Sequence, residues 1–174
     1  MEFVYIFDVD DTLIATTACI RAINEAGEVV FKAGTKVFNA PDSTERLLRP
    51  GLTWDFSEFE SLEQIMSAPV KPTFNYLKSL PPHSKIYIIT ARQRQDMLHQ
   101  WLLNNNVHID IDHIYCFDRN YSGSVAQWKG QVIDSIILKH PYHRMMIFED
   151  DYNNCVAMAE ACGRREVPFR LMPV

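Results

Sequence analysis

The stretch that most constrains the fold of this chain runs from Phe3 to Leu13 and reads FVYIFDVDDTL. Its first five residues form an uninterrupted apolar run, which is typical of a strand in the middle of a parallel sheet with helices over both faces. Asp8, Asp10 and Asp11 follow within four positions. In open α/β sheets, ligands bind outside the carboxyl ends of the strands. We therefore expect a buried first strand with an acidic site at its end.

Asp8 and Asp10 are two residues apart and can converge on one small volume if the chain bends after Asp8. A pair of this kind suits a divalent cation, which prefers oxygen ligands. It also suits acid–base chemistry in which one carboxyl group is ionised and the other carries a proton. The pair thus indicates metal binding, acid–base chemistry or both.

The second half of the chain alternates buried-strand patterns with helical ones. Such alternation predicts a parallel sheet with right-handed crossover connections. The last helix is expected to end at Gly163, since glycine favours the position just after a helix. The expected strands are 85–89, 113–117, 144–148 and 168–171, and the expected helices are 73–80, 93–103, 125–138 and 152–162.

The segment 14–69 is too long for a single connection in a compact domain, so we expect it to carry structure of its own. Gly34 lies between two short β patterns and predicts the turn of a hairpin. The expected elements are helix or loop over 14–25, a hairpin of 28–32 and 36–38, a short helix capped by 40–43 and ending at 48, and a helix over 57–66 capped by Ser57.

Composition sets limits on the class of protein. The chain has 174 residues, 47% of them apolar and 22% charged, which fits one globular domain. Its net charge of −5 argues against a protein that coats nucleic acid nonspecifically. The four cysteines form no C-x-x-C pair, and we expect reduced thiols. The sequence has neither a signal peptide nor an apolar run of membrane-spanning length, so we expect a cytoplasmic protein without a membrane partner.

Polar residues also follow the later predicted strands. Taken singly, each has an ordinary structural explanation, because acids cap helices, threonine forms turns and most lysines are exposed. Their joint placement at one edge of a sheet favours a shared site. These residues are Thr90, Ala91 and Arg92 after the second strand, Lys129 near the start of a helix, and Asp150 and Asp151 after the fourth strand.

In this order, the motifs resemble those of the haloacid dehalogenase-like (HAD) superfamily. Phe7 to Leu13 resembles the first motif, D-x-D-x-T after a buried strand, and the later motifs are matched by Thr90, by Lys129 and by Asp150 with Asp151. The resemblance implies an α/β fold, namely a HAD-like Rossmannoid three-layer sandwich with a central parallel sheet. It also implies a single domain over 1–174, with a small cap, 14–69, inserted after the first strand.

The resemblance implies a chemistry as well. Asp8 would be the nucleophile that forms an aspartyl-phosphate, and Asp10 would be the general acid and base. An acid at Asp10 favours phosphatase over dehalogenase chemistry, which implies a Mg²⁺-dependent phosphoric monoester hydrolase. Thr90 and Lys129 would stabilise the transferred phosphoryl group. Thr12, Ala91 and Arg92 would contact the substrate, and Asp8, the backbone carbonyl of Asp10, Asp150 and Asp151 would hold Mg²⁺.

The fourth motif, Glu149-Asp150-Asp151, can be read as an E-D pair or as a D-D pair. Counting back from Gly163 favours the D-D pair, because the helix after the motif then has the length usual in the family. On this reading Glu149 is the weaker metal candidate. The sequence leaves open which of Asp150 and Asp151 contacts the metal directly.

The substrate implied by the resemblance is a nucleotide or a 3'-phosphorylated nucleic-acid end. The T-A-R at 90–92 and the run with Val156 and Met158 resemble the phosphatase half of phage polynucleotide kinase-phosphatases. The stretch 52–72 resembles small phage HAD-like proteins, so the compartment would be the host cytoplasm if the chain is phage-encoded. No G-x-x-x-x-G-K-[ST] loop is present, which excludes the kinase half.

Residues of the expected cap have two interpretations. Lys32, Lys36, Arg46 and Arg49 can meet an anionic substrate or form a solvated face. Phe38, Trp54 and Phe56 can stack on a base or pack the core of the cap.

Three alternatives to a nucleotide phosphatase stay open. One is a phosphatase for another small phosphorylated metabolite. Another is a phosphotransferase or mutase, which would need a second phosphate pocket and a larger cap. The third is a non-catalytic binding protein that retains the fold.

Overall fold

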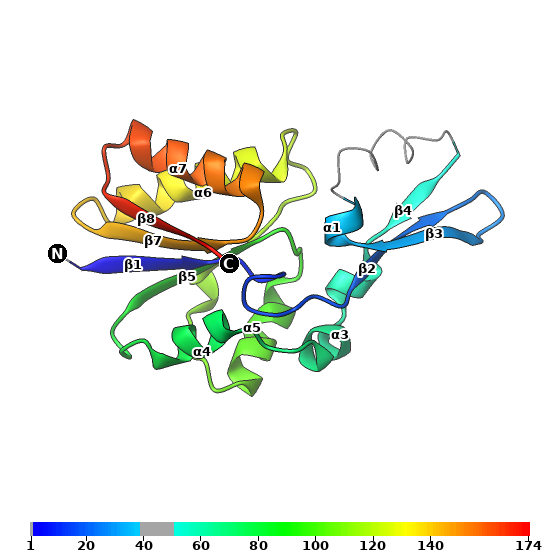
Figure 1. Cartoon of the computed structure of the whole chain (residues 1–174), viewed down its shortest axis with the longest axis horizontal. Helices are drawn as coiled ribbons and strands as arrows, with labels where there is room; N and C mark the ends of the chain where they lie inside the picture. Colours follow the sequence, from blue (N-terminus) through cyan, green and yellow to red (C-terminus); the bar gives the residue numbers. More distant parts are fainter. Residues whose placement is uncertain (1, 39–50) are drawn as a thin grey trace. The chain divides into compact units, whose positions relative to one another are not determined.

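The computed structural model describes residues 2–38 and 51–174 (Figure 1). The chain divides into two compact units, which we describe separately. The parallel-sheet unit comprises Met1–Ala15 and Pro69–Val174, and the inserted unit comprises Thr16–Ala68.

Five parallel strands form the sheet of the parallel-sheet unit, in the order β6-β5-β1-β7-β8. The predicted central position of the first strand is confirmed, since β1 has a neighbour on each side. The four later strands predicted from the sequence are also present, with bounds that differ by one or two residues. The strands are β1 (Phe3–Phe7), β5 (Lys85–Thr90), β6 (Ile114–Cys116), β7 (Arg144–Glu149) and β8 (Phe169–Pro173).

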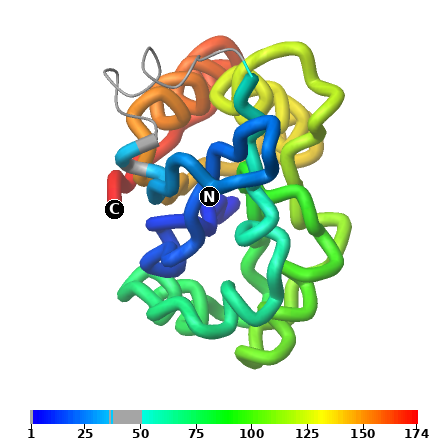
Figure 2. The backbone as a smooth tube through the Cα atoms, turned by 90° about the vertical axis from the view of Figure 1, so that its right-hand side faces the viewer, coloured from blue at the N-terminus to red at the C-terminus, as the bar shows by residue number. Residues whose placement is uncertain are grey.

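Helices cover both faces of this sheet, as the alternation of strands and helices predicts. α4 (Pro72–Ser79) and α5 (Gln95–Asn104) lie over one face, and α6 (Val125–Lys139) and α7 (Tyr152–Arg164) lie over the other (Figure 1). Figure 2 shows α6 and α7, in yellow and orange, side by side. The unit therefore has a mixed α/β architecture with a central parallel sheet.

Alternation along β1 explains why both faces are covered. Val4 and Ile6 are fully buried in a core that includes residues of α6 and α7. Phe7 stacks on Phe148 of β7, with ring centroids 4.5 Å apart. The ring centroids of Phe148 and Tyr76 of α4 are 5.3 Å apart. Since successive side chains of a strand point to opposite faces, the apolar run FVYIF supplies both cores at once.

The helix starts follow local sequence, but one predicted helix end is wrong. Ser124 forms a capping box with Gln127 at the start of α6. Gly163, predicted to end the last helix, lies inside α7, which continues to Arg164. The left-handed residue beyond this helix is Glu166, with φ 55°. Glycine at 163 is therefore tolerated within the last turn and does not end the helix.

The chain leaves and re-enters the parallel-sheet unit at neighbouring points. The backbone N–H of Ala15 donates to the carbonyl of Pro69 at 2.7 Å, and Ile14 forms an antiparallel bridge with Val70. The N–H of Lys71 donates to Leu13 O at 2.9 Å. These bonds join the segment before the inserted unit directly to the segment after it.

The inserted unit contains a three-stranded antiparallel sheet in the order β3-β2-β4. Trp54 of β4 contacts Phe31 of β3 edge to face, at 6.4 Å between ring centroids. The elements are β2 (Cys19–Ile23), β3 (Val29–Gly34), α1 (Thr35–Phe38), β4 (Thr53–Asp55), the 3-10 helix η1 (Ser57–Glu60) and α3 (Leu62–Ser67).

Several predictions for the inserted unit are wrong. Residues 14–25, expected as helix or loop, contain β2. The predicted hairpin of 28–32 with 36–38 does not form, because β3 runs through Gly34 and pairs with β2. The turn of the actual hairpin contains Gly27, whose φ of 82° suits glycine. The expected helix 57–66 is divided, and Ser61 caps α3 in place of Ser57. The predicted helix ending at 48 lies outside the described residues.

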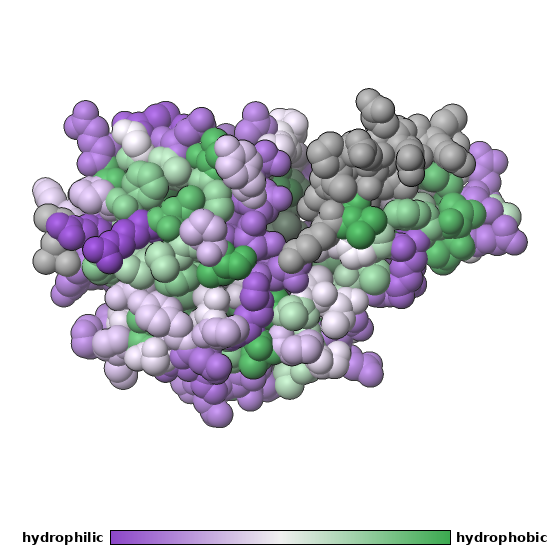
Figure 3. Space-filling view, viewed as in Figure 1, coloured by the Kyte–Doolittle hydropathy of each residue, from purple (hydrophilic) through white to green (hydrophobic). Residues whose placement is uncertain are grey.

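The surface is mixed in character. Figure 3 shows hydrophilic and hydrophobic residues interspersed on the face of the parallel-sheet unit in view.

Within the described ranges, no helix has both the length and the apolar character needed to span a bilayer. All four cysteines are free thiols, as predicted.

Candidate functional site

A buried ion cluster lies at the carboxyl ends of β1 and β7. Asp8 directly follows β1, and its backbone N–H donates to Phe148 O at 3.0 Å, which fixes it beside β7. Lys129 of α6 donates from Nζ to Asp8 Oδ1 at 2.7 Å and to Glu149 Oε2 at 2.6 Å. The side chains of Lys129 and Glu149 are each 1% exposed. One ammonium group thus bridges two carboxylates away from water.

Burial and crowding of like charges perturb these groups. Burial raises the pKa of Asp8 well above its usual value, the Lys129 ammonium opposes this, and the neighbouring carboxylates of Glu149 and Asp10 add to it. The pKa of Asp150 is raised to about 6, first by burial and then by Glu149 and Asp11. Burial lowers the pKa of Lys129, but the charges of Asp8 and Glu149 outweigh it and raise that pKa above its usual value. The carboxyl groups of Asp8, Glu149 and Asp150 therefore outnumber the single ammonium group of Lys129.

The carboxylates are placed to share a cation. Single oxygens of Asp8, Glu149 and Asp150 all lie within 4.8 Å of one another. Hard divalent cations such as Mg²⁺ prefer carboxylate oxygens, and a cation among these three would offset both the burial and the like-charge repulsion that raise the pKa values of Asp8 and Asp150. The donor set therefore fits a divalent cation.

The geometry at the end of β7 differs from the D-D reading that the sequence favoured. Asp151 is the N-cap of α7, and its Oδ1 accepts the N–H of Asn154 at 3.0 Å. Glu149 is still within β7 and reaches Lys129, so Glu149 and Asp150 are the pair brought to Asp8. Gly163, from which the D-D pair was counted, is the next-to-last residue of α7 and not its end. Glu149, ranked as the weaker candidate, belongs to the cluster.

Arg92 pairs with Asp10. Its Nε donates to Asp10 Oδ2 at 2.9 Å and its Nη2 donates to Oδ1 at 2.8 Å, a bidentate geometry that fixes the carboxylate. The Arg92 side chain is only 1% exposed. The guanidinium that was expected to contact substrate therefore holds the expected general acid and base.

Thr12 and Ala91, which were predicted to contact substrate, lie in the loops after β1 and β5, whereas Thr90, which was predicted to be catalytic, is the last residue of β5. The hydroxyl of Thr90, fully buried, accepts the N–H of Arg92 at 3.2 Å, while Ala91 between them is exposed. Thr12 is fully buried, and its Oγ1 has no hydrogen-bond partner among the described residues. An unpaired buried hydroxyl is costly, so Thr12 carries one unsatisfied polar atom within the loop that follows Asp8.

Asp11 is a site residue that the predictions left without a role. It adopts φ 56°, a left-handed conformation that aspartate tolerates better than most residues. Its backbone carbonyl accepts a hydrogen bond from Nζ of Lys71, and its charge contributes to the raised pKa of Asp150. The run of three acids in the first motif was the only sequence signal for this residue.

The charges of the inserted unit are partly neutralised within that unit. Glu58 forms ion pairs with Arg21 and with Lys32, the latter at 3.2 Å. Burial raises the pKa of Glu58, but these partners and the N–H of Cys19 outweigh it and lower that pKa to about 2. Lys32 is thus engaged in an ion pair, although its side chain is 52% exposed.

The aromatic candidates of the inserted unit differ from one another. Trp54 packs against Phe31, which supports the core-packing interpretation, whereas Phe56 is 39% exposed. The side chains of Lys36 and Phe38, and the residues Arg46 and Arg49, lie outside what the structure describes.

No protein-family model matches the chain, and a search of curated proteins finds no significant relative.

Proposed function

We propose that this chain is a Mg²⁺-dependent phosphomonoester hydrolase of the HAD type, which acts through an aspartyl-phosphate on Asp8. The observation that carries the proposal is the cluster of Asp8, Lys129, Glu149 and Asp150 at the carboxyl ends of β1 and β7. Within this proposal, the inserted unit occupies the sequence position of the family's small cap.

Asp8 would act as the nucleophile. Its carboxylate oxygen attacks phosphorus in line with the leaving oxygen, a phosphorus–oxygen bond to Asp8 forms, and the bond to the leaving alkoxide breaks. Lys129 already donates to Asp8 Oδ1 at 2.7 Å, so it holds one carboxylate oxygen in place and leaves the other for attack. The same ammonium group would offset charge on the transferred phosphoryl group.

Asp10 would move the proton. It would protonate the leaving alkoxide in the first step and take a proton from the attacking water in the second. Arg92 fixes the orientation of Asp10 through two hydrogen bonds, so Arg92 is a positioning residue in this scheme. The hydroxyl of Thr12, in the loop after β1, and that of Thr90, the last residue of β5, would be the neutral donors of this scheme.

Mg²⁺, when bound, would supply positive charge opposite the phosphate oxygens. Asp8, Glu149 and Asp150 are the side chains that would hold it, together with the backbone carbonyl of Asp10. Asp151 is engaged as a helix cap through one of its oxygens. This assignment replaces the D-D pair by the E-D pair.

Release of inorganic phosphate from p-nitrophenyl phosphate tests the proposal. We expect turnover with MgCl₂, loss of turnover with a chelator, and a decrease of about 100-fold or more in Asp8→Asn, because an amide cannot act as the nucleophile. Asp112→Asn makes the same chemical change at an exposed position and should retain activity. Full activity in Asp8→Asn, or no phosphate release from any phosphomonoester tried, would refute the proposal.

A further inference from the structure

Lys71 occupies a position at which lysine is locally unfavourable. It is the N-cap of α4, and its side chain makes no capping hydrogen bond. Serine, threonine, aspartate and asparagine are preferred at an N-cap, because their oxygens accept the free N–H groups of the first turn. The helix dipole also opposes a positive charge at this end. The lysine therefore lowers the stability of α4, which indicates that its side chain has a role outside the helix.

The ammonium group of Lys71 reaches the loop that follows β1. Its Nζ donates to the backbone carbonyl of Asp11, and its own backbone N–H donates to Leu13 O at 2.9 Å. Lys71 thus holds this loop on both sides of Thr12, which is fully buried. All four residues belong to the parallel-sheet unit.

The backbone of Asp10 is joined to the segment that carries Lys71. Asp10 forms a parallel bridge with Ile14. Ile14 forms an antiparallel bridge with Val70, which directly precedes Lys71. Between them, Asp11 adopts φ 56°, a conformation that persists only where neighbouring contacts enforce it. The hydrogen bond from Lys71 to the Asp11 carbonyl is one such contact.

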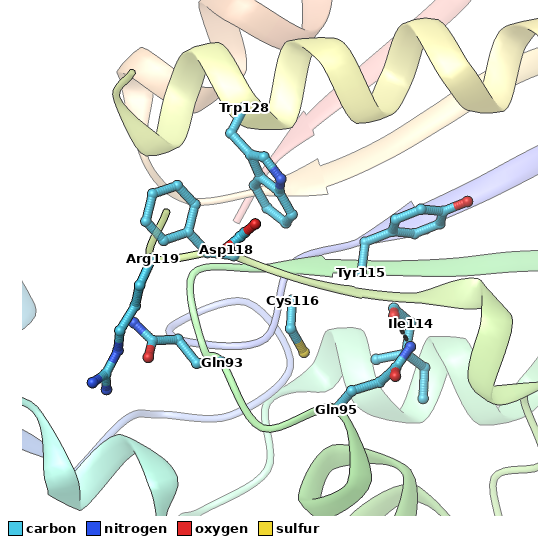
Figure 4. A pocket seen from close by; sticks show the side chains of 9 residues that line it. Gln93, Gln95, Ile114, Tyr115, Cys116, Asp118, Arg119 and Trp128 are labelled. Atoms are coloured by element: carbon cyan, nitrogen blue, oxygen red, sulfur yellow. Dashed lines mark hydrogen bonds between the residues drawn. The ribbon is translucent and has the colours of Figure 1, made fainter. Parts of the chain in front are cut away.

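The carboxylate of Asp10 has a second support, from the loop after β5. Arg92 holds it through two hydrogen bonds, and the N–H of Phe117 in turn donates to Arg92 O at 3.0 Å. Gln93, the next residue, lines a groove of about 530 Å³ beside β6 (Figure 4). Arg92 is not among the residues that line this groove, since its side chain is buried against Asp10. The position of the Asp10 carboxylate thus depends on Arg92 for its side chain and on the loop after β1 for its backbone.

We propose that Lys71 is a positioning residue for proton transfer by Asp10. By holding the carbonyl of Asp11, Lys71 keeps the loop in the conformation in which the Asp10 carboxyl group meets Arg92. From there Asp10 gives its proton to the leaving oxygen as the bond between that oxygen and phosphorus breaks. The inference deepens the proposed phosphatase function and rests on it.

The leaving group of the substrate distinguishes this role from a general loss of structure. The p-nitrophenolate ion leaves without a proton, whereas the alkoxide of glycerol phosphate has to be protonated. Lys71→Ser removes the ammonium group and supplies a preferred N-cap, so the Tm should stay close to that of the parent chain. We expect Lys71→Ser to lower kcat/KM for glycerol phosphate by about 10- to 100-fold, and kcat/KM for p-nitrophenyl phosphate by less than about threefold. These values report only the steps up to the aspartyl-phosphate, so activation of water by Asp10 does not enter.

Three variants complete the kinetic test. Asp10→Asn should show the same dependence on the leaving group, because it removes the proton donor itself. Lys71→Arg keeps a charged donor and should restore kcat/KM for glycerol phosphate to within about threefold of the parent value. Lys78→Ser makes the same change at an exposed position of α4 and should leave both values unchanged. Equal losses with both substrates in Lys71→Ser, or no loss with either, would overturn the inference.

Spectra of the full chain test the positioning without turnover. The Nε–H of Arg92 reports on the Asp10 carboxylate, because it donates to Oδ2 at 2.9 Å. In ¹H–¹⁵N spectra, Lys71→Ser should shift this signal and the backbone amides of Asp11 and Thr12, whereas Lys78→Ser should not. An unchanged Arg92 signal would overturn the inference. If the parent chain hydrolyses no phosphomonoester, the phosphatase proposal is refuted, and this spectrum alone decides whether Lys71 positions Asp10.

Discussion

Replacing Lys129 by methionine measures the free-energy cost of keeping the carboxylates of Asp8 and Glu149 buried without their ammonium partner. Methionine has a similar length and no charge, so Asp8 and Glu149 would lose the ammonium that lies 2.7 and 2.6 Å from them. Removing one partner of a buried ion pair typically costs about 3–5 kcal/mol, because the remaining charge is left uncompensated. In a chain of this size, 1 kcal/mol corresponds to about 2–4 °C in Tm, so we expect Lys129→Met to lower Tm by about 6–20 °C.

Thermal unfolding followed by circular dichroism at pH 7.5, with a chelator present, measures this loss. Lys139→Met is the matched control, because Lys139 lies on the same helix α6, is exposed, and should change stability by less than about 1 kcal/mol. Addition of MgCl₂ should recover part of the loss in Lys129→Met, since a cation that binds only the folded state stabilises it.

The deficit of Lys129→Met should also become smaller as the pH falls. Asp8 already has a raised pKa in the folded chain, so it takes up protons at a pH where the unfolded chain does not. Without Lys129 this difference is larger, and protonation relieves the buried charge as the pH decreases toward about 5. Lys129→Met and Lys139→Met with equal Tm values at pH 7.5 would refute the reasoning, because the carboxylates would then not be buried against Lys129.

Three further outcomes follow from local features. Ser124→Ala removes the capping box of α6 and should lower the free energy of unfolding by about 0.5–2 kcal/mol in urea titrations, with an unchanged m-value. Asp11→Gly should be tolerated at φ 56°, whereas Asp11→Val should cost about 1–2 kcal/mol, so equal Tm values for the two variants would contradict the left-handed assignment. Burial and the nearby positive charges lower the pKa of His140. The stability that its neutral form contributes is therefore present above pH 6.5 and is lost as the pH falls through the lowered value. His140→Gln should lose less stability than the parent chain over this interval.

The sequence predicted the parallel-sheet unit well because its signals are strong there. Apolar runs such as FVYIF are buried on both faces, and strands regularly alternate with helices, so the order of the strands and α-helices after Pro81 agrees with the structure, although the 3-10 helix Ile111–His113 was not predicted. The short inserted unit has weaker signals. β2 reads CIRAI, with a charged residue in its centre, and Arg21 forms ion pairs there with Asp55 and Glu58, which lie further along the chain.

The site shows the same distinction between local and distant information. Asp8, Thr90 and Lys129 were predicted as site residues because each follows or lies near a recognisable element, and the structure brings Asp8 and Lys129 together. The choice between Glu149 and Asp151 depended on which side chain reaches Lys129, a contact that spacing along the sequence does not specify. The Arg92 to Asp10 pair joins residues 82 positions apart and was likewise not predictable from either motif alone.

The hydrogen bond between Ala15 and Pro69 bears on whether the inserted unit can be removed from the chain. Since the backbone bonds at Ile14, Ala15 and Lys71 join the two ends of the interruption directly, the continuity of the five-stranded sheet does not depend on what is placed between those ends. A short glycine and serine connector should therefore substitute for Thr16–Ala68 and yield a smaller protein that keeps its buried ion cluster, and homologous or foreign segments should be exchangeable at the same two points.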